Sequence, residues 1–121
     1  MKRRVMIIGG GASGMTAAIA AAREGADAVI LEHTKRPGKK ILYTGNGKCN
    51  LTNLDMRKEA FRGENPGFAW KVVGEVPVKE TLSFFEDLGL VLTDRNGYVY
   101  PATGQASSVL DALRFELERL N

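Results

Sequence analysis

The glycine-rich segment at residues 9–14, Gly-Gly-Gly-Ala-Ser-Gly, constrains the fold of this chain more than any other feature of its sequence. It directly follows the apolar run 4–8, which is typical of a buried parallel strand. An alanine-rich stretch comes next and predicts a helix over 13–24, and the apolar run 28–32 predicts a second buried strand. A strand, a helix and a strand within about 30 residues form a βαβ unit, whose crossover is expected to be right-handed.

Within this unit, Gly9 to Gly14 follows the G-x-G-x-x-G pattern of dinucleotide-binding loops. We expect Gly9 to permit the tight turn, Gly11 to let the backbone approach a pyrophosphate, and Gly14 to let the helix pack closely on the strands. The free N–H groups and the positive dipole end of the helix favour an anion there. Ala12 and Ser13 therefore join the candidate cofactor-binding residues.

The acidic residue Glu32 ends the second predicted strand, 18 residues after Gly14. Its carboxylate is expected to accept hydrogen bonds from a ribose diol and to repel a 2′-phosphate, which disfavours NADP at this site. The spacing leaves both FAD and NAD open as ligands. The expected fold class is α/β, with a Rossmann-like FAD/NAD(P)-binding fold.

Composition narrows the class of protein further. A chain of 121 residues is one domain or part of one, and the single cysteine excludes a disulfide scaffold and suits a reducing, cytoplasmic compartment. The apolar run at 5–8 is too short for a signal peptide, and no run is long enough to cross a membrane, so no membrane partner is expected. With one histidine and one cysteine, no metal site is expected either.

Basic residues gather in the stretch 33–48, which contains five lysines and arginines and no acidic residue. Such a stretch could meet a phosphate-bearing ligand. Because Tyr43 is the one aromatic residue in the stretch and no nucleic-acid motif occurs, nucleic acid is not an expected partner.

The rest of the chain predicts a mixture of loops, helices and a hairpin. Residues 33–53 read as mostly loop, with a short helix near 40–43, and 54–76 are poorly patterned with a turn at 65–67. Apolar spacing predicts a helix over 78–88, and strands at 90–93 and 98–100 flank the hairpin signal Asn96-Gly97. A last helix is expected over 108–120, with Ser108 and Asp111 spaced as a capping box.

A second candidate site lies in the stretch 37–53, Pro-Gly-Lys-Lys-Ile-Leu-Tyr-Thr-Gly-Asn-Gly-Lys-Cys-Asn-Leu-Thr-Asn. Its glycines would allow close backbone approach to a planar ligand, and its amides and hydroxyls supply donors and acceptors. An ordinary glycine-bearing surface turn would have the same composition.

Together, the glycine motif, Glu32 and the 37–53 stretch resemble the N-terminal part of the aminoacetone-oxidase-like FAD-binding flavoproteins. That family is also known as NAD(P)/FAD-dependent oxidoreductases, and it includes flavin reductases of bile-acid enones. Its usual signature reads Gly-Arg-Lys, a hydrophobic pair, one variable residue, and Ser-Gly-Gly-Gly-Arg-Cys-Asn. This chain has lysine at both arginine positions (Lys39 and Lys48), Thr44 for the serine and Asn46 for the middle glycine. The stretches 84–101 and 106–113 also match, so the resemblance spans nearly the whole chain.

The resemblance implies a glutathione-reductase-like FAD-binding fold, here incomplete, with a β-hairpin and flanking helices. Family members run to about three times this length, so residues 1–121 would be the N-terminal segment of an FAD-binding domain whose second domain and C-terminal flavin-binding segment are absent. The cofactor implied is FAD, which passes hydride or electrons to a small organic substrate or oxygen, with NAD(P)H as a candidate reductant. Further cofactor-binding positions implied are His33, Lys39, Lys40, Gly45, Asn46, Gly47, Lys48, Cys49 and Asn50.

Catalytic residues are not identifiable from the sequence. A nucleophilic pair of Cys49 and His33 is disfavoured, because His33 directly follows Glu32 and is expected to flank the adenosine. Cys49 is either a thiol beside the flavin or a small packed residue. The chain alone is expected to be inactive. The alternative function is a stand-alone NAD-binding or sensing module without catalysis.

Overall fold

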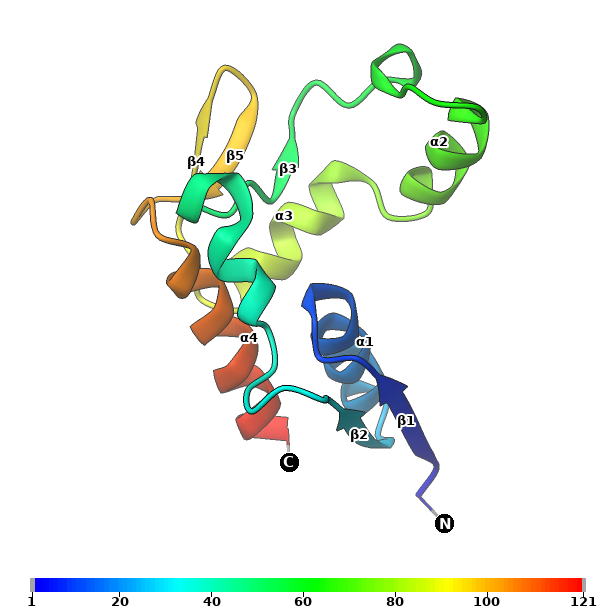
Figure 1. Cartoon of the computed structure of the whole chain (residues 1–121), viewed down its shortest axis with the longest axis vertical. Helices are drawn as coiled ribbons and strands as arrows, with labels where there is room; N and C mark the ends of the chain where they lie inside the picture. Colours follow the sequence, from blue (N-terminus) through cyan, green and yellow to red (C-terminus); the bar gives the residue numbers. More distant parts are fainter. Residues whose placement is uncertain (1, 121) are drawn as a thin grey trace.

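The computed structural model describes residues 2–120. Strand β1 (Arg4–Ile8) pairs in parallel with β2 (Asp27–Leu31), and helix α1 (Ala12–Arg23) connects them (Figure 1). The register places Arg4 opposite Asp27 and Ile8 opposite Leu31. The predicted βαβ unit and the α/β Rossmann-like fold class are therefore confirmed, with each element within one residue of its expected bounds.

The remaining elements include a second, antiparallel sheet of order β3-β5-β4, which lies at the other end of the molecule (Figure 1). The hairpin β4–β5 turns at Asn96 and Gly97, whose φ values of 51° and 86° fit the predicted two-residue turn. In chain order the elements are the 3₁₀ segment η1 (Lys39–Gly47), β3 (Thr52–Asn53), η2 (Lys58–Ala60), α2 (Pro66–Gly74), α3 (Val78–Asp87), β4 (Leu92–Arg95), β5 (Tyr98–Pro101) and α4 (Ala106–Leu120).

The hydrophobic core lies where α1, α4 and η1 meet. Met15 and Ile19 from α1, Ile41 from η1 and Leu113 from α4 are at most 4% exposed. An ionic network closes one end of this core: Arg23 Nη2 lies 2.7 Å from Glu116 Oε1, so α1 is tied to α4. The core thus fixes the first turn of η1 against the helix that follows the glycine loop.

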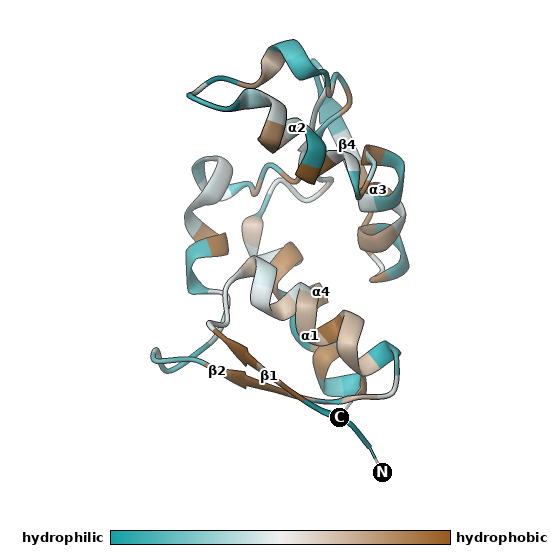
Figure 2. Cartoon of the chain, turned by 90° about the vertical axis from the view of Figure 1, so that its right-hand side faces the viewer, coloured by the Kyte–Doolittle hydropathy of each residue, from teal (hydrophilic) through white to brown (hydrophobic). Residues whose placement is uncertain are grey.

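The β1–β2 sheet is covered on one face and bare on the other. Ile7 and Ile30 face α1 and the core, whereas Met6 is 62% exposed and Ile8 is 89% exposed. Figure 2 shows the two hydrophobic strands at the lower edge of the molecule, with α1 above them. The prediction that both strands are buried on both faces is therefore wrong for residues 2–120, because α1 covers a single face.

Three local predictions are corrected by the structure. Residues 65–67 are the start of α2 rather than a free turn: Asn65 caps the helix, accepting a hydrogen bond from the Phe68 N–H at 3.1 Å, and Pro66 follows at its first position. The predicted loop 33–53 contains the strand β3, which pairs with β5.

The third correction concerns the last helix. It begins at Ala106, so Ser108 lies inside the first turn and is not the N-cap of a capping box with Asp111. The Ser108 hydroxyl instead lies 2.7 Å from the Thr103 hydroxyl. Within residues 2–120, no helix has the length and apolar character needed to span a membrane.

Candidate functional site

The glycine loop between β1 and α1 has the backbone shape that the motif requires. Gly9 has a φ of 94°, a conformation that side chains rarely adopt, and its N–H donates to the Leu31 carbonyl at 2.8 Å. A Cβ added to Gly14 would lie 1.9 Å from the Gly9 carbonyl oxygen. The helix therefore packs as closely on the strand as predicted, and only glycine fits at this contact.

Gly11 has a different environment from Gly14. It is the N-cap of α1, and a Cβ placed on it would meet no atom within 4 Å. Space for an approaching ligand is therefore open at the N-terminus of α1. Ala12 and Ser13 occupy the exposed first turn of this helix.

Glu32 follows the last residue of β2 and is held by backbone donors. One carboxylate oxygen accepts the Thr34 N–H at 2.8 Å, and the other accepts the Gly10 N–H at 2.7 Å. These two bonds, with a smaller contribution from neighbouring His33, lower the pKa of Glu32 to about 2. The carboxylate is consequently ionised at neutral pH, with its side chain 15% exposed.

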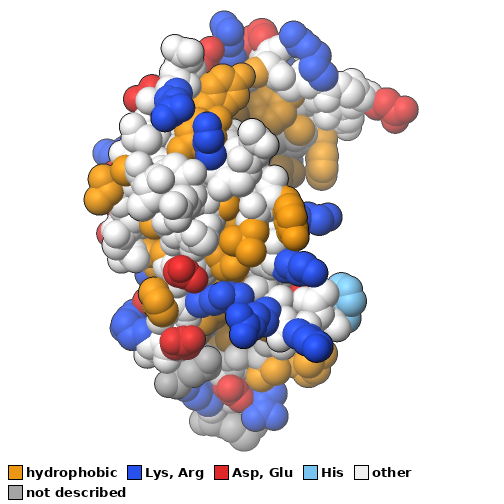
Figure 3. Space-filling model, turned by 60° about the vertical axis from the view of Figure 1, so that its left-hand side comes forward, with side chains coloured by type: hydrophobic (Ala, Val, Ile, Leu, Met, Phe, Trp, Pro, Cys, Tyr) orange, Lys and Arg blue, Asp and Glu red, His pale blue; other side chains and the backbone are white. Residues whose placement is uncertain are grey.

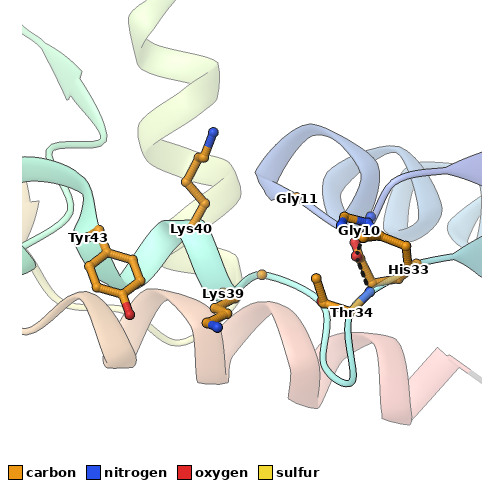
Figure 4. A pocket seen from close by; sticks show the side chains of 9 residues that line it. Gly10, Gly11, His33, Thr34, Lys39, Lys40 and Tyr43 are labelled. Atoms are coloured by element: carbon orange, nitrogen blue, oxygen red, sulfur yellow. Dashed lines mark hydrogen bonds and ion pairs between the residues drawn. The ribbon is translucent and has the colours of Figure 1, made fainter.

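A pocket of about 320 Å³ lies between the glycine loop and the segment that follows β2. In Figure 4, Gly10, Gly11, His33 and Thr34 line one side, and Lys39, Lys40 and Tyr43 from η1 line the other. The arrangement brings an ionised carboxylate, a helix N-terminus and two lysines to one opening. Such a pocket can bind a ligand that carries both hydroxyl groups and phosphates.

The structure does not bring every predicted site residue into this pocket. The segment 45–50 lies outside its lining, at the far end of η1. Lys48 instead lines a smaller hollow of about 160 Å³ together with Arg95 and Tyr100. Of the predicted site residues, Gly11, Glu32, His33, Lys39 and Lys40 line this pocket, whereas Gly9, Ala12, Ser13 and Gly14 do not. The 45–50 segment forms a separate group.

The 45–50 segment has an unusual backbone. Gly45 and Gly47 have φ values of 54° and 79°, and Asn46 between them also has a φ of 54°. Asparagine tolerates this left-handed conformation better than most residues. Asn46 therefore has, at the position of the middle glycine of the related signature, a conformation that glycine adopts readily. A Cβ on Gly45 would lie 2.6 Å from the Asn50 nitrogen, so this position requires glycine.

Cys49 has a φ of 57° and is 7% exposed, within the hydrophobic core cluster. Its environment supports the packed-residue interpretation of the sequence, and its contact with a cofactor stays a prediction. His33, in contrast, is 93% exposed on the surface and lies 3.0 Å from Glu32. The two side chains are therefore not placed as a nucleophilic pair. Among residues 2–120, no three His, Cys, Asp or Glu side chains gather as metal ligands.

Four residues that line the pocket had no individual binding role predicted from the sequence: Thr34, outside both candidate segments, and Gly10, Gly38 and Tyr43, within them. Gly10 and Thr34 contribute through backbone N–H groups that hold Glu32, a role with no side-chain signature. Gly38 has a φ of 78°, and a Cβ there would lie 2.2 Å from Leu110. The Pro-Gly pair at 37–38 was a turn signal, but the helix it packs against could not be identified from the sequence.

Comparisons with known proteins agree with this geometry. The chain is 54% identical, over 118 residues, to a 3-dehydro-bile acid delta(4,6)-reductase of Clostridium scindens, and the match covers 96% of this chain and 29% of that protein. It is 28% identical, over 116 residues, to a ribosomal RNA dihydrouridine synthase of Escherichia coli, covering 96% of this chain and 29% of that protein. The chain thus spans less than a third of the length of these relatives.

The family model described as the HI0933-like protein Rossmann domain matches residues 3–121, which is nearly the whole chain. The predicted family resemblance and the Rossmann fold class are both confirmed by this match. The glycine loop, the close packing at Gly14 and the carboxylate after β2 are the structural features of such a domain that this chain provides. The chain belongs to the family of HI0933-like Rossmann domains.

Proposed function

We propose that this chain binds the ADP portion of FAD and is the N-terminal segment of the FAD-binding domain of a flavin-dependent oxidoreductase. The observation that carries the proposal is the pocket shared by the glycine loop, the N-terminus of α1 and Glu32. When bound, FAD supplies the redox chemistry through its ring system. The residues of this chain bind and orient it.

For the pyrophosphate and for the ribose of FAD, the pocket has a group of complementary charge or hydrogen-bonding capacity. The N–H groups at the start of α1 favour the pyrophosphate, and the open space beside Gly11 admits it. The ribose hydroxyls would donate to Glu32, whose low pKa keeps it an acceptor at neutral pH. Lys39 and Lys40 line the opposite side of the pocket and add positive charge.

The names of the relatives support one substrate class over another. The bile acid reductase is by its name a reductase of a small organic molecule, and it is 54% identical to this chain. We therefore propose a small organic substrate for the whole protein, with NAD(P)H as its candidate reductant and a cytoplasmic location. The second domain and the flavin-ring segment are proposed to lie in the part of the relatives that this chain does not match.

A ribosomal RNA substrate is the second candidate, because two relatives carry that activity in their names. The exposed basic residues between 33 and 48 favour it. The lower identities, 28% and 27%, and the absence of a nucleic-acid motif favour the small molecule. Binding of a single-stranded RNA oligonucleotide at physiological salt would shift the proposal toward RNA.

The experiment compares the wild-type chain with Gly11→Val after incubation with FAD, and measures bound ligand by equilibrium dialysis and folding by far-UV circular dichroism. We expect Gly11→Val to lose FAD binding with a native spectrum, because valine fills the space beside the loop. Gly74→Val is the matched control: its Cβ also meets no atom within 4 Å, and it lies at the end of α2, away from the pocket. Unchanged FAD binding by Gly11→Val would refute the assignment.

Equilibrium dialysis with NAD in place of FAD distinguishes the alternative of a stand-alone NAD-binding module. Such a module would bind NAD at least as well as FAD, and the purified protein would show no visible flavin bands. Tighter binding of NAD than of FAD would favour the module.

A further inference from the structure

A second pocket, of about 500 Å³, lies beside the proposed FAD pocket. Thr34 and Lys39 line both pockets, so the connection after β2 forms a wall between them. Its other sides come from the first turn of η1 and from one face of α4. Neither the family match nor the proposed FAD site accounts for this cavity.

Positive charge dominates the lining. Lys35, Arg36, Lys39 and Arg114 face this pocket with a single carboxylate, Asp111. Lys35, Arg36 and Lys39 form no ion pair within residues 2–120. Figure 3 shows lysine and arginine side chains gathered on this face near the histidine. Basic side chains that lie together without acidic partners create a positive electrostatic potential, which favours a multiply charged anion.

Arg114 is the fixed element of the pocket. Its Nη2 donates to the Pro37 carbonyl at 3.4 Å, its Nη1 lies 3.9 Å from Asp111, and its side chain is only 29% exposed. A guanidinium has five N–H donors, so these two contacts leave donors available. The planar fork of arginine matches the oxygens of a phosphate.

The loop that carries Lys35 and Arg36 is held by hydrogen bonds on both sides. The Thr34 hydroxyl donates to the Arg36 carbonyl at 2.9 Å, and the Gly38 N–H donates to the Gly10 carbonyl. Lys35 and Arg36 thus project from a loop whose backbone is anchored to the FAD pocket. Leu42, which is 38% exposed, supplies an apolar surface in the same cavity, above the 2% exposed Leu110.

From this arrangement we propose that the second pocket binds a phosphate monoester carried on an adenosine nucleotide. The monoester dianion meets the four cations, and the flat base lies on the apolar surface. A 2′-phosphoadenosine group has this chemistry. The FAD pocket disfavours the same group, because the Glu32 carboxylate repels a 2′-phosphate.

Calorimetric titration of Gly11→Val, in which the proposed ADP site is blocked, with 2′-phospho-ADP-ribose and with ADP-ribose tests this proposal, because Gly11 does not line the second pocket. We expect the phosphorylated ligand to bind at least about tenfold more tightly, because it adds charge-assisted hydrogen bonds. Inorganic phosphate should compete, and added salt should reduce the difference between the two ligands. Equal affinity for the two ligands would overturn the proposal.

The double variant Lys35→Gln with Arg36→Gln should remove the preference for the phosphorylated ligand. The matched control is Arg62→Gln with Lys71→Gln, which removes the same charge from exposed positions outside both pockets. An equal loss in the control would show that net charge and not the pocket sets the preference. A preference that persists in Lys35→Gln with Arg36→Gln would also overturn the proposal.

Gly11→Val separates this proposal from the proposed FAD function. It should abolish FAD binding and leave the affinity for 2′-AMP unchanged, since Gly11 does not line the second pocket. Loss of 2′-AMP binding in Gly11→Val would place the phosphate in the first pocket and contradict the second site. Tighter binding of single-stranded RNA, whose phosphates are diesters, than of 2′-AMP in competition would contradict the preference for a monoester.

Discussion

The two faces of the β1–β2 sheet differ sharply. On one face, Ile7 and Ile30 contact α1 and the core, and the close approach at Gly14 leaves no room for a side chain. On the other face, Met6, Ile8 and Leu31 are 62%, 89% and 46% exposed. Both faces have the apolar composition of strands in a buried parallel sheet.

This difference shows which part of the molecule finds all of its packing contacts within residues 2–120. The glycine loop depends on contacts between β1, β2 and α1, and residues 2–120 provide all of these. The bare face depends on a further layer, because parallel sheets are stable when both faces are covered. We propose that segments of the longer protein cover it, in line with the 29% coverage of the relatives.

The largest effect is expected at the closest contact of the covered face. Valine at position 14 would place a Cβ 1.9 Å from a backbone oxygen, which neither strand nor helix can accommodate without separating. We expect Gly14→Val to lose cooperative thermal unfolding altogether. The control variant Gly74→Val should unfold like the wild type. If Gly14→Val also unfolded cooperatively at the wild-type temperature, the close packing would be contradicted.

The next largest effect is expected in the core between α1 and α4. Leu113 is 1% exposed, and Leu113→Ala removes its side chain and leaves a cavity. The expected loss is about 3 kcal/mol in the free energy of unfolding, measured by urea denaturation. If the loss is below about 1 kcal/mol, the α1–α4 interface is not the stabilising core.

A smaller, pH-dependent effect is expected at the ionic network that closes this core. Hydrogen bonds from Arg119 and then Arg23 lower the pKa of Glu116 to about 2 from 4.5. A carboxyl whose pKa is lowered by folding stabilises the native state fully above its unfolded pKa, and this contribution disappears as the pH falls from about 4.5 to 2.

Glu116→Gln should therefore destabilise the protein at neutral pH and weaken the acid dependence of unfolding between pH 5 and 2. Glu32, whose pKa is lowered in the same direction, keeps part of that dependence. Unfolding midpoints of both proteins across this range are the measurement. Identical acid dependence in the two proteins would contradict the role of Glu116.

The smallest effect is expected on the bare face. Ile8→Thr replaces a side chain that is 89% exposed and keeps a β-branched residue in the strand. We expect the free energy of unfolding to change by less than about 0.5 kcal/mol. A loss as large as that of Leu113→Ala would show that this face is covered in solution, which sedimentation equilibrium would reveal as self-association.

Local patterns in the sequence predicted the βαβ unit well, because the glycine motif, the alanine run and the short apolar runs each specify local structure. The roles of Gly9 and Gly14 followed from the same motif and are confirmed by the backbone geometry. Tertiary contacts could not be predicted in this way. The pairing of β3 with β5, the placement of Gly38 against Leu110, and the exposure of Ile8 all depend on segments distant in the sequence.

In the candidate site, too, local features could be predicted from the sequence and tertiary contacts could not. The position of Glu32 followed from its place at the end of the second predicted strand, but its hydrogen bonds to the Gly10 and Thr34 backbone have no side-chain signature. The separation of the 45–50 segment from the pocket depends on how η1 extends along α4.

The most direct test of the account is the ratio of the affinities of this chain for FAD and for ADP, measured by titration with ADP as competitor. The proposed ADP site is built from the glycine loop and Glu32, whereas the 45–50 segment alone is expected to hold the flavin ring poorly. Because linked half-sites strengthen binding only when both are present, we expect weak FAD binding, within about tenfold of ADP, with ADP competing and no turnover with NADH or NADPH. An FAD affinity many orders of magnitude tighter than that for ADP, together with reductase activity, would contradict the account.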